Sequence, residues 1–209
     1  MTDLTPRAAA KRQQIMDAAL AVFLENGYVG ASMDQVAALA AVSKQTVYKQ
    51  FKDKEHLFRS IIEDVGDRVD DPFVEISEQV AETDDVERAI HELAGRFVTT
   101  IMDPRVQQIR RLVIGEAVRF PALGRAYWER GFGRAIATVA GCFARLDERG
   151  LLKVEDPMTA ANHFAGLLLW IPSNRVMFHG RTDAVSAEEL GTFAASGARA
   201  FLTAYGTPS

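Results

Sequence analysis

Residues 32–58 read SMDQVAALAAVSKQTVYKQFKDKEHLF, and this stretch decides the fold of the N-terminal part of the chain. Ser32, with Gln35 three residues later, forms a capping box that predicts the start of a short helix. Ser43 is placed to cap a second short helix, and Asp53 to cap the helix that follows it. Two short helices joined by a tight turn are typical of a helix-turn-helix.

The second short helix has one apolar face and one polar face. Val47 and Phe51 form the apolar anchor, and Thr46 lies at the flank. The polar residues of the outer face are Lys44, Gln45, Tyr48 and Lys49. A helix about 10–12 Å wide fits the major groove of DNA, where N-terminal residues reach base edges and Lys or Tyr side chains hold phosphates. The alternative is a helix face that is merely solvated.

Longer helices flank this unit on both sides. Residues 8–26 show an amphipathic period, and Asn26-Gly27 predicts the end of that helix. Residues 54–69 carry the apolar stripe of an exit helix. Leu39 is expected on the inner face of the first short helix. The first and the exit helix would close the core over the two short helices.

The charge is distributed unevenly along the 209 residues. Residues 1–60 hold 8 Lys+Arg and 6 Asp+Glu, a net charge of +2, while the rest of the chain holds 16 and 22, a net charge of −6. Opposite signs suggest that the two parts have different functions. The overall charge of −4 argues against unspecific coating of nucleic acid.

Several classes of protein are not expected. The N-terminus lacks a secretory signal, and the apolar run Phe164 to Ile171 is too short to cross a membrane, so we expect a soluble cytoplasmic protein. Cys142 is the only cysteine and reads as a buried, inert thiol. The four histidines show no metal-ligand spacing, and GxSxG, P-loop and GxGxxG patterns are absent. We expect no metal, no cofactor and no enzyme.

The run from Ala10 to Phe58 resembles the TetR family of bacterial transcriptional regulators. The motifs that carry the resemblance are Phe23 with Gly27, Ser32-Met33, Val42-Ser43, Thr46-x-Tyr48-x-x-Phe51 and Lys54-Glu55 with Leu57-Phe58. The resemblance implies that double-stranded DNA, as a palindromic operator, is contacted by Ser32, Ser43, Lys44, Gln45, Thr46, Tyr48, Lys49 and Lys54. It assigns phosphate contacts to Tyr48 and Lys54.

Two positions depart from the family pattern. Ala41 replaces a common Gly in the turn, which would cost about 1 kcal/mol if φ is positive there. Gln45 also replaces a frequent Gly. A Gln side chain can pair with adenine through two hydrogen bonds, so we expect Gln45 to read a base. The alternative for Gln45 is an amide exposed to water.

The sequence predicts an all-α protein with an N-terminal three-helix helix-turn-helix domain and a C-terminal helical bundle. The expected division is residues 1–53, a connecting helix at 54–70, and an effector-binding and dimerisation domain at 71–209. Asp71-Pro72 and Asp103-Pro104 each predict a helix start, and Pro121 one long helix that ends at Arg149-Gly150. The stretch from Arg110 to Gly131 weakly resembles one subgroup of TetR C-terminal domains.

The resemblance implies a homodimer formed through the last two helices, and the sequence supports it separately. The helix that contains Phe164 to Ile171 is apolar all round, so both of its sides must be covered. A two-fold dimer would hold two recognition helices roughly 34–36 Å apart.

The resemblance also implies an effector pocket, for which aromatic residues with a few polar ones are the candidates. They are Phe97, Glu116, Phe120, Tyr127, Trp128, His163, Phe164, Leu167, Trp170 and Phe178. Aromatic residues at helical spacing are more often part of a core than of a pocket. Glu116 is placed to pair with Arg110, Arg119 or an effector cation, and we expect a structural ion pair. The expected function is a repressor that a small hydrophobic effector releases from its operator. The alternatives are a DNA-binding dimer without an effector and, remotely, an enzyme on a helical bundle.

Overall fold

The computed structural model describes residues 6–68 and 72–207, and the described chain is built from helices. It divides into two compact units. The first combines the N-terminal residues through 69 with residues 109–128, and the second combines residues 70–108 with residues 129–209. The all-α prediction is confirmed.

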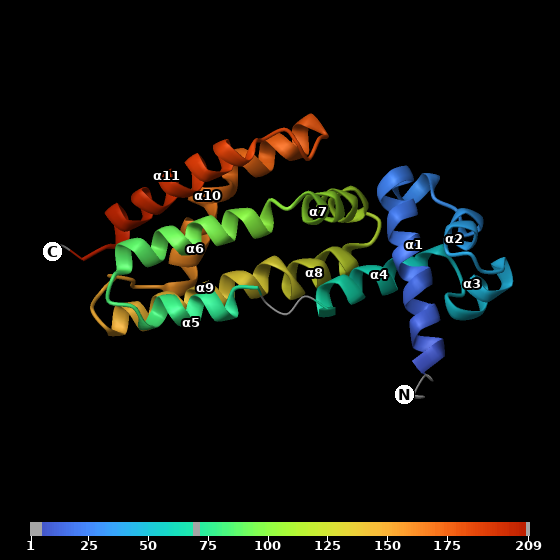
Figure 1. The fold of residues 1–209 in the computed structure, drawn as a ribbon, viewed down its shortest axis with the longest axis horizontal. Helices are drawn as coiled ribbons and strands as arrows, with labels where there is room; N and C mark the ends of the chain where they lie inside the picture. Colours follow the sequence, from blue (N-terminus) through green and yellow to red (C-terminus); the bar gives the residue numbers. More distant parts are fainter. Residues whose placement is uncertain (1–5, 69–71, 208–209) are drawn as a thin grey trace. The chain divides into compact units, whose positions relative to one another are not determined.

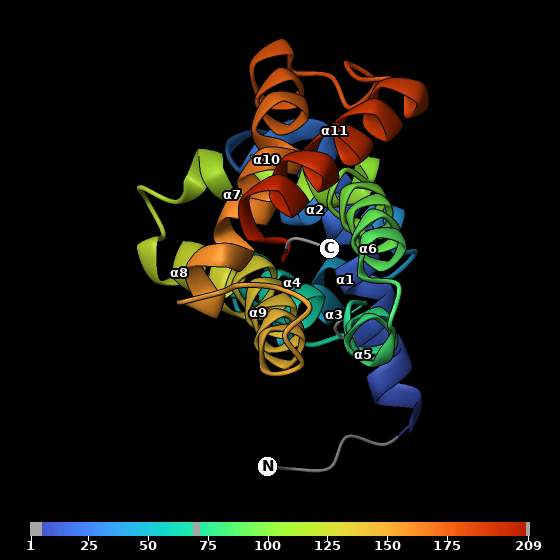
Figure 2. The same ribbon diagram turned by 90° about the vertical axis from the view of Figure 1, so that its left-hand side faces the viewer.

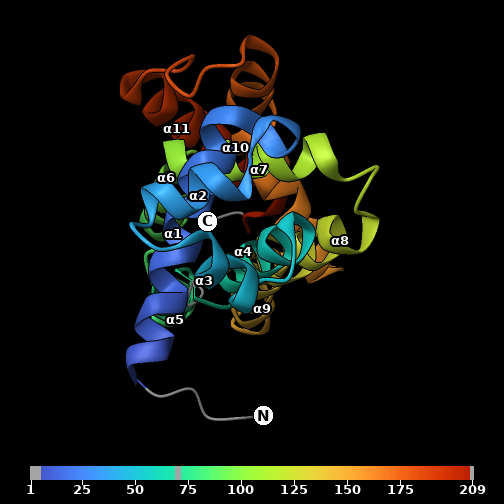
Figure 3. The ribbon, with the colours of Figure 1, turned by 90° about the vertical axis from the view of Figure 1, so that its right-hand side faces the viewer.

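The first unit contains the two short helices and their supports (Figures 1 and 3). Its helices are α1 (Pro6–Gly30), α2 (Met33–Leu39), α3 (Lys44–Gln50) and α4 (Lys54–Arg68), with most of α7 (Pro104–Glu116) and of α8 (Pro121–Arg130). Gly27, with φ of 67°, interrupts the helical backbone of α1 at the end that the sequence predicts. This conformation suits glycine because it has no Cβ.

An aromatic cluster forms the centre of the first unit. The rings of Phe23 and Phe58 lie 5.1 Å apart, and Tyr28 lies 5.0 Å from both Phe58 and Phe120. Such edge-on and tilted contacts add to the free energy gained from burying the rings. The rings come from α1, from α4 and from Phe120 directly before α8. Their packing holds together the helices that support α2 and α3.

The second unit is a helical bundle (Figures 1 and 2). Its further helices are α5 (Val74–Glu82), α6 (Val86–Ile101), α9 (Phe132–Glu148), α10 (Pro157–His179) and α11 (Ala187–Tyr205). α10 packs against α11 and α9, α11 also packs on α6, and α5 packs on α9. At Gly197 the α11 backbone lies so close to α10 that a Cβ would stand 2.6 Å from a methyl group of Leu168.

Fully buried phenylalanines hold the bundle together. Phe143, Phe164 and Phe201 contact one another with ring centroids 4.7–5.4 Å apart. Burying each such side chain contributes about 1.5–3 kcal/mol. Cys142 is buried beside them, and burial raises the pKa of its thiol to about 11. A thiol in this state is unreactive, as expected.

Three details differ from the sequence-based expectations. Leu39 is 58% exposed, because α2 ends there and only its Val36 side faces the core. Gly131 breaks the long helix expected from Pro121, since its φ and ψ of −101° and −100° are not helical. α5 begins at Val74, two residues after Pro72, with no side chain capping it. Its expected cap, Asp71, lies outside the described residues.

The compact units also differ from the expected division of the chain. Residues 109–128 were expected in the C-terminal domain, but they pack within the first unit. The reason is their apolar side, where Ile109, Val113 and Leu123 are buried in the same core as Phe58. The boundaries of the units therefore fall inside α7 and α8, where the sequence shows no linker.

α10 exposes a row of large apolar side chains on its outer face. Leu167, Trp170 and Ile171 are 46%, 74% and 50% exposed, and Phe178 near the end of the helix is 86% exposed. A soluble chain rarely leaves so many large apolar groups uncovered on one element. Within the described residues, no helix has the length and hydropathy needed to cross a membrane.

Candidate nucleic-acid interface

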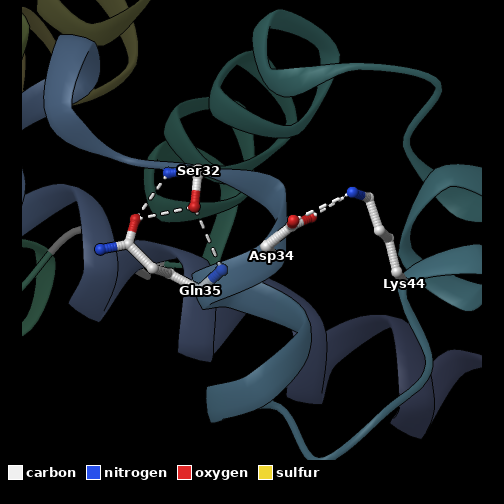
Figure 4. Close-up of polar contacts among 4 residues, drawn as sticks. All are labelled: Ser32, Asp34, Gln35 and Lys44. Atoms are coloured by element: carbon white, nitrogen blue, oxygen red, sulfur yellow. Dashed lines mark hydrogen bonds and ion pairs between the residues drawn. The ribbon is translucent and has the colours of Figure 1, made fainter.

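The capping box at Ser32 fixes the start of α2 (Figure 4). The Gln35 carbonyl oxygen accepts hydrogen bonds from the backbone N–H of Ser32 at 2.8 Å and from its hydroxyl at 2.9 Å. The hydroxyl oxygen in turn accepts the N–H of Gln35 at 3.2 Å. The single proton of the Ser32 hydroxyl is therefore already donated within the box. Ser32 can donate to a phosphate only if that bond opens.

The turn between α2 and α3 is tight and slightly strained. The N–H groups of Ala41 and Val42 donate to carbonyls at the end of α2, at 3.1 and 3.0 Å. Ala41 is the one non-glycine residue of the described chain with positive φ, at 49°. An alanine in this conformation costs about 1 kcal/mol relative to glycine. The chain nevertheless changes direction at this turn, so that α3 does not continue the axis of α2.

Ser43 caps α3 in a way that leaves one hydroxyl proton available. Its Oγ accepts the N–H of Thr46 at 3.2 Å and lies 2.8 Å from the hydroxyl oxygen of Thr46. The two hydroxyls share one hydrogen bond, so only one of their two protons is used. The other can be donated outward to an acceptor such as a phosphate oxygen.

α3 is fixed to the unit by its inner side. Val47 is fully buried and Phe51 is 2% exposed. The guanidinium of Arg12 lies 4.2 Å from the centre of the Phe51 ring and also donates to the Ser60 hydroxyl at 3.2 Å. Sequence analysis missed Arg12, because a cation stacked on a ring from another helix leaves no spacing pattern.

The outer side of α3 presents free polar groups. Gln45, Tyr48 and Lys49 are exposed, and none of their side chains has a hydrogen-bond or ion-pair partner in the described part of the chain. A short helix that is anchored on one side and has unused donors and acceptors on the other has the form of a DNA-recognition helix. The structure thus brings these three predicted residues together on one face.

Lys44 differs from its neighbours, because it is already paired (Figure 4). Its ammonium lies 2.8 and 2.9 Å from the two carboxylate oxygens of Asp34 on α2. The hydrogen bond and the charge of Asp34 raise the pKa of Lys44. Both side chains are exposed, so the pair is weak in water. No local pattern indicates the pairing with Asp34, which lies ten positions before Lys44 across the turn.

Lys54 has a structural contact that the sequence did not reveal. Its ammonium donates to the backbone carbonyls of Tyr28, Val29 and Ala31, at 2.8, 3.2 and 2.9 Å, and lies 4.7 Å from the centre of the Tyr28 ring. A lysine has three donors, and all three are used here. A phosphate could bind Lys54 only in exchange for one of these bonds, so its expected phosphate contact stays a prediction.

The ten effector candidates do not come together in one place. Phe97 and Phe164 are fully buried in the second unit, with ring centroids 5.9 Å apart. His163 is exposed, with its Nδ1 2.6 Å from the hydroxyl of Tyr205. Exposed apolar candidates on the two units are Trp128, Leu167, Trp170 and Phe178.

The remaining candidates belong to the first unit. Phe120 and Tyr127 pack against its core, and burial raises the pKa of Tyr127 to about 12. Glu116 is half-buried and makes no ion pair with any described residue, so the pair expected with Arg110 or Arg119 is wrong. Its backbone carbonyl instead accepts the N–H of Phe120 at 2.8 Å, which turns the chain toward α8.

The geometry therefore defines a class of protein: an all-α protein with a helix-turn-helix unit and a helical bundle. The comparisons agree with this class. Residues 15–61 match the model of the bacterial regulatory proteins of the TetR family, and residues 88–207 match that of the C-terminal domain of AefR-like transcriptional repressors. Within the described residues, no group of His, Cys, Asp and Glu side chains is placed to hold a metal ion.

Solved structures extend the similarity along the chain. A TetR-family transcriptional regulator from Mesorhizobium loti is 41% identical over 97% of this chain and all of its own, with a TM-score of 0.89. The flavonoid-responsive regulator FrrA is 27% identical, over 97% of this chain and all of its own, with a TM-score of 0.70. The chain belongs to the TetR family of transcriptional regulators, which are DNA-binding proteins and not enzymes.

Curated relatives match about a quarter of the chain. The repressor SCO4008 of Streptomyces coelicolor is 39% identical over 54 residues, which is 26% of this chain and 28% of that protein. The activator FasR of Mycolicibacterium smegmatis is 38% identical over 53 residues, which is 25% of this chain and 24% of that protein. The match thus spans about a quarter of the length of each of these relatives, and they include both a repressor and an activator.

Proposed function

We propose that the protein is a homodimeric repressor that binds a palindromic operator and is released from it by a small lipophilic effector. The observation that carries the DNA-binding part is the outer face of α3, where Gln45, Tyr48 and Lys49 have unused polar groups while Val47 and Phe51 are buried. Such a regulator acts where the chromosome lies, in the cytoplasm.

The exposed residues of α3 take different roles in this proposal. Gln45, in the first turn of the helix, reads an adenine through its amide. Tyr48, Lys49 and the spare hydroxyl proton of the Ser43–Thr46 pair hold phosphates, which positions the helix but carries no sequence information. Lys44 joins them once it exchanges Asp34 for DNA.

Dimerisation is supported by the exposed apolar face of α10. TetR-family regulators are dimers. Two copies of a face that contains Leu167, Trp170 and Ile171 could cover each other around a two-fold axis, which fits an isologous interface. The dimer would present two α3 helices to two half-sites of an operator.

Support for release by an effector comes from the similar proteins. It does not come from a cavity lined by the ten candidate residues. One structural neighbour is a flavonoid-responsive regulator, and the C-terminal model is that of a repressor domain. An effector would act through a difference in its affinity for the two states of the dimer. The close packing of Phe97 on Phe164 favours the second candidate, a DNA-binding dimer without an effector in this bundle.

The decisive experiment is selection of bound duplexes from a random DNA library at a stated salt concentration. We expect a palindrome with evenly spaced half-sites. Gln45→Ala should then relax the preference at one base position by about 1–3 kcal/mol. Lys49→Ala should weaken binding to all sequences and reduce the salt slope by about one unit.

Two results would contradict parts of the proposal. Recovery of no preferred sequence by folded protein would remove the operator-binding function. An unchanged preferred site for Gln45→Ala would remove the base-reading role and leave the regulator intact. A subsequent screen of aromatic compounds for release of the selected operator tests the effector separately.

A further inference from the structure

A pocket of about 200 Å³ lies within the first unit, outside the outer face of α3. One wall is the first half of α4, which contributes Glu55, Phe58 and Arg59. The other wall consists of Arg119 and Phe120, at the end of the loop between α7 and α8, and of residues at the start of α8. Of the ten effector candidates, only Phe120 lines this pocket, so the sequence did not indicate it.

The charged residues of the pocket are mostly positive. Arg59, Arg119 and Arg125 line it, against a single carboxylate, Glu55. Glu55 is paired with Arg59 at 3.2 Å along α4. No carboxylate of the described chain pairs with Arg119 or Arg125. The residues that line the pocket therefore carry a net positive charge, which favours an anionic ligand.

Arg119 is held in place in a way that keeps its donors free. Its guanidinium lies 5.0 Å from the centre of the Tyr28 ring and 5.2 Å from that of the Phe120 ring. A stacked guanidinium uses its flat face on a ring, while its five N–H donors point outward in the plane. In the described chain, no acceptor takes a hydrogen bond from the Arg119 side chain. The two rings thus restrict the position of the guanidinium before any ligand arrives.

The rest of the pocket offers apolar contacts. Phe58, Phe120 and Leu123 line it together with Pro121, the first residue of α8. The N-terminus of a helix adds a partial positive charge, which supports the guanidinium groups. Phe58 is already 1% exposed, whereas the Phe120 ring is only partly buried. An inorganic anion would leave Phe120 partly uncovered, whereas an apolar body attached to an anionic group would contact both this ring and the guanidinium groups.

We propose that this pocket is a binding site for a small aromatic carboxylate. The carboxylate accepts hydrogen bonds from the edge of Arg119, a geometry in which a guanidinium donates two parallel bonds. The ring lies against the apolar residues of the pocket. The volume is below the roughly 300–1,000 Å³ of pockets for drug-sized ligands, so one ring is the appropriate size. This inference goes beyond the proposed function, because a small aromatic carboxylate can bind to the pocket whether or not the protein binds an operator.

Calorimetric titration of the full-length protein with benzoate, at low ionic strength, tests the site. Benzamide is the neutral probe of the same shape, and inorganic phosphate is the anion without a ring. We expect benzoate to bind at least tenfold more tightly than either. Arg119→Gln should weaken benzoate binding at least tenfold, and Arg125→Gln should weaken it severalfold. Arg105→Gln removes a charge that is also exposed, but from the second unit, and should change benzoate binding less than twofold.

Because Arg119 stacks on core rings, the fold of its variant is checked by circular dichroism and by its urea midpoint. Within the described chain, Arg125 makes no cation–π contact with a ring, so its variant remains informative if Arg119→Gln is unfolded. Equal binding of benzamide or of phosphate would overturn the proposal, as would undetectable benzoate binding. Benzoate binding that survives both pocket variants would overturn it too, since the ligand would then bind elsewhere. None of these outcomes depends on whether an operator exists.

Discussion

At the scale of the residue, the interface separates side chains that support the fold from side chains that face outward. Lys54 and Lys49 show the contrast. Both are lysines of the helix-turn-helix region, but the ammonium of Lys54 donates to three backbone carbonyls, whereas Lys49 has no partner in the described chain. Their chemical identity is the same, so only their neighbours distinguish a structural contact from an available cation.

Lys54→Ala should therefore lower the stability of the first unit. Carbonyls at the end of α1 would lose a charged donor, and hydrogen bonds to charged groups contribute about 1.5–3 kcal/mol. We expect a loss of about 2 kcal/mol in urea unfolding followed by circular dichroism. Lys52→Ala removes an exposed lysine nearby and should stay within about 0.5 kcal/mol. Equal effects of the two variants would mean that the three bonds contribute nothing.

Tyr127 predicts a dependence on alkaline pH. Burial raises its pKa from 10.0 to about 12, so the folded state disfavours the ionised ring. Its contribution to stability is fully present below pH 10 and is lost as pH rises from 10 to 12. Absorbance titration of tyrosinate in the wild type, minus that of Tyr127→Phe, should show one group that titrates near pH 12. A difference curve with its midpoint near 10 would show that the ring is open to water.

At the scale of the element, α2 and α3 act as one unit, because their caps and their turn fix how α3 is presented. The pair between Asp34 of α2 and Lys44 of α3 adds an electrostatic link across that turn (Figure 4). The same pair places a carboxylate beside the face proposed to meet DNA. Asp34 therefore opposes phosphate binding twice, by its own charge and by occupying Lys44.

Asp34→Asn should strengthen binding to duplex DNA of any sequence. Lys44 becomes free for a phosphate, so the salt slope should steepen by about 0.9, and affinity at low salt should rise up to about fivefold. Fluorescence anisotropy over a range of salt concentrations measures both. Glu25→Gln removes one exposed charge from α1 without touching Lys44 and serves as the control. The pair would be irrelevant to DNA binding if both variants gave the same slope.

At the scale of the whole molecule, the exposed face of α10 is the feature that the single chain does not explain. Trp170 is 74% exposed beside Leu167 and Ile171, although its helix contributes Phe164 and Leu168 to the core on the other side. A helix that is apolar all round needs a cover on both sides. A second copy of the chain would supply it, in agreement with the family.

Trp170→Glu should convert the dimer into a monomer, because the carboxylate would have to be buried without a partner. Sedimentation velocity at micromolar concentration measures the change in mass. Trp128→Glu is the matched control, since Trp128 is also more than half exposed but lies on α8. A dimer that persists in Trp170→Glu would place the interface elsewhere.

Local patterns in the sequence were sufficient for much of the fold. Ser32 with Gln35 and Ser186 with Glu189 both form the capping boxes that three-residue spacing indicates. Asp103 caps a helix that begins with proline, as expected, and Asp156 caps α10, which also begins with proline. The predicted anchors Val47 and Phe51 are buried. These features depend on residues within one or two helical turns of each other, and over that distance the geometry of the helix determines which residues meet.

What only the tertiary structure decided are the contacts between distant segments. Residues 109–128 join the first unit because their apolar side fits its core, and no local signal marks the change. The partners of Lys44 and Lys54, and the stacking of Arg119 on Tyr28, likewise join different elements. The sequence by itself determined the helices, their caps and the kind of protein, since these follow from short-range periodicity and motifs. The availability of each charged group was decided by packing, because whether a cation is free depends on acceptors that lie 10 to 26 residues away in the pairs of Lys44 and Lys54.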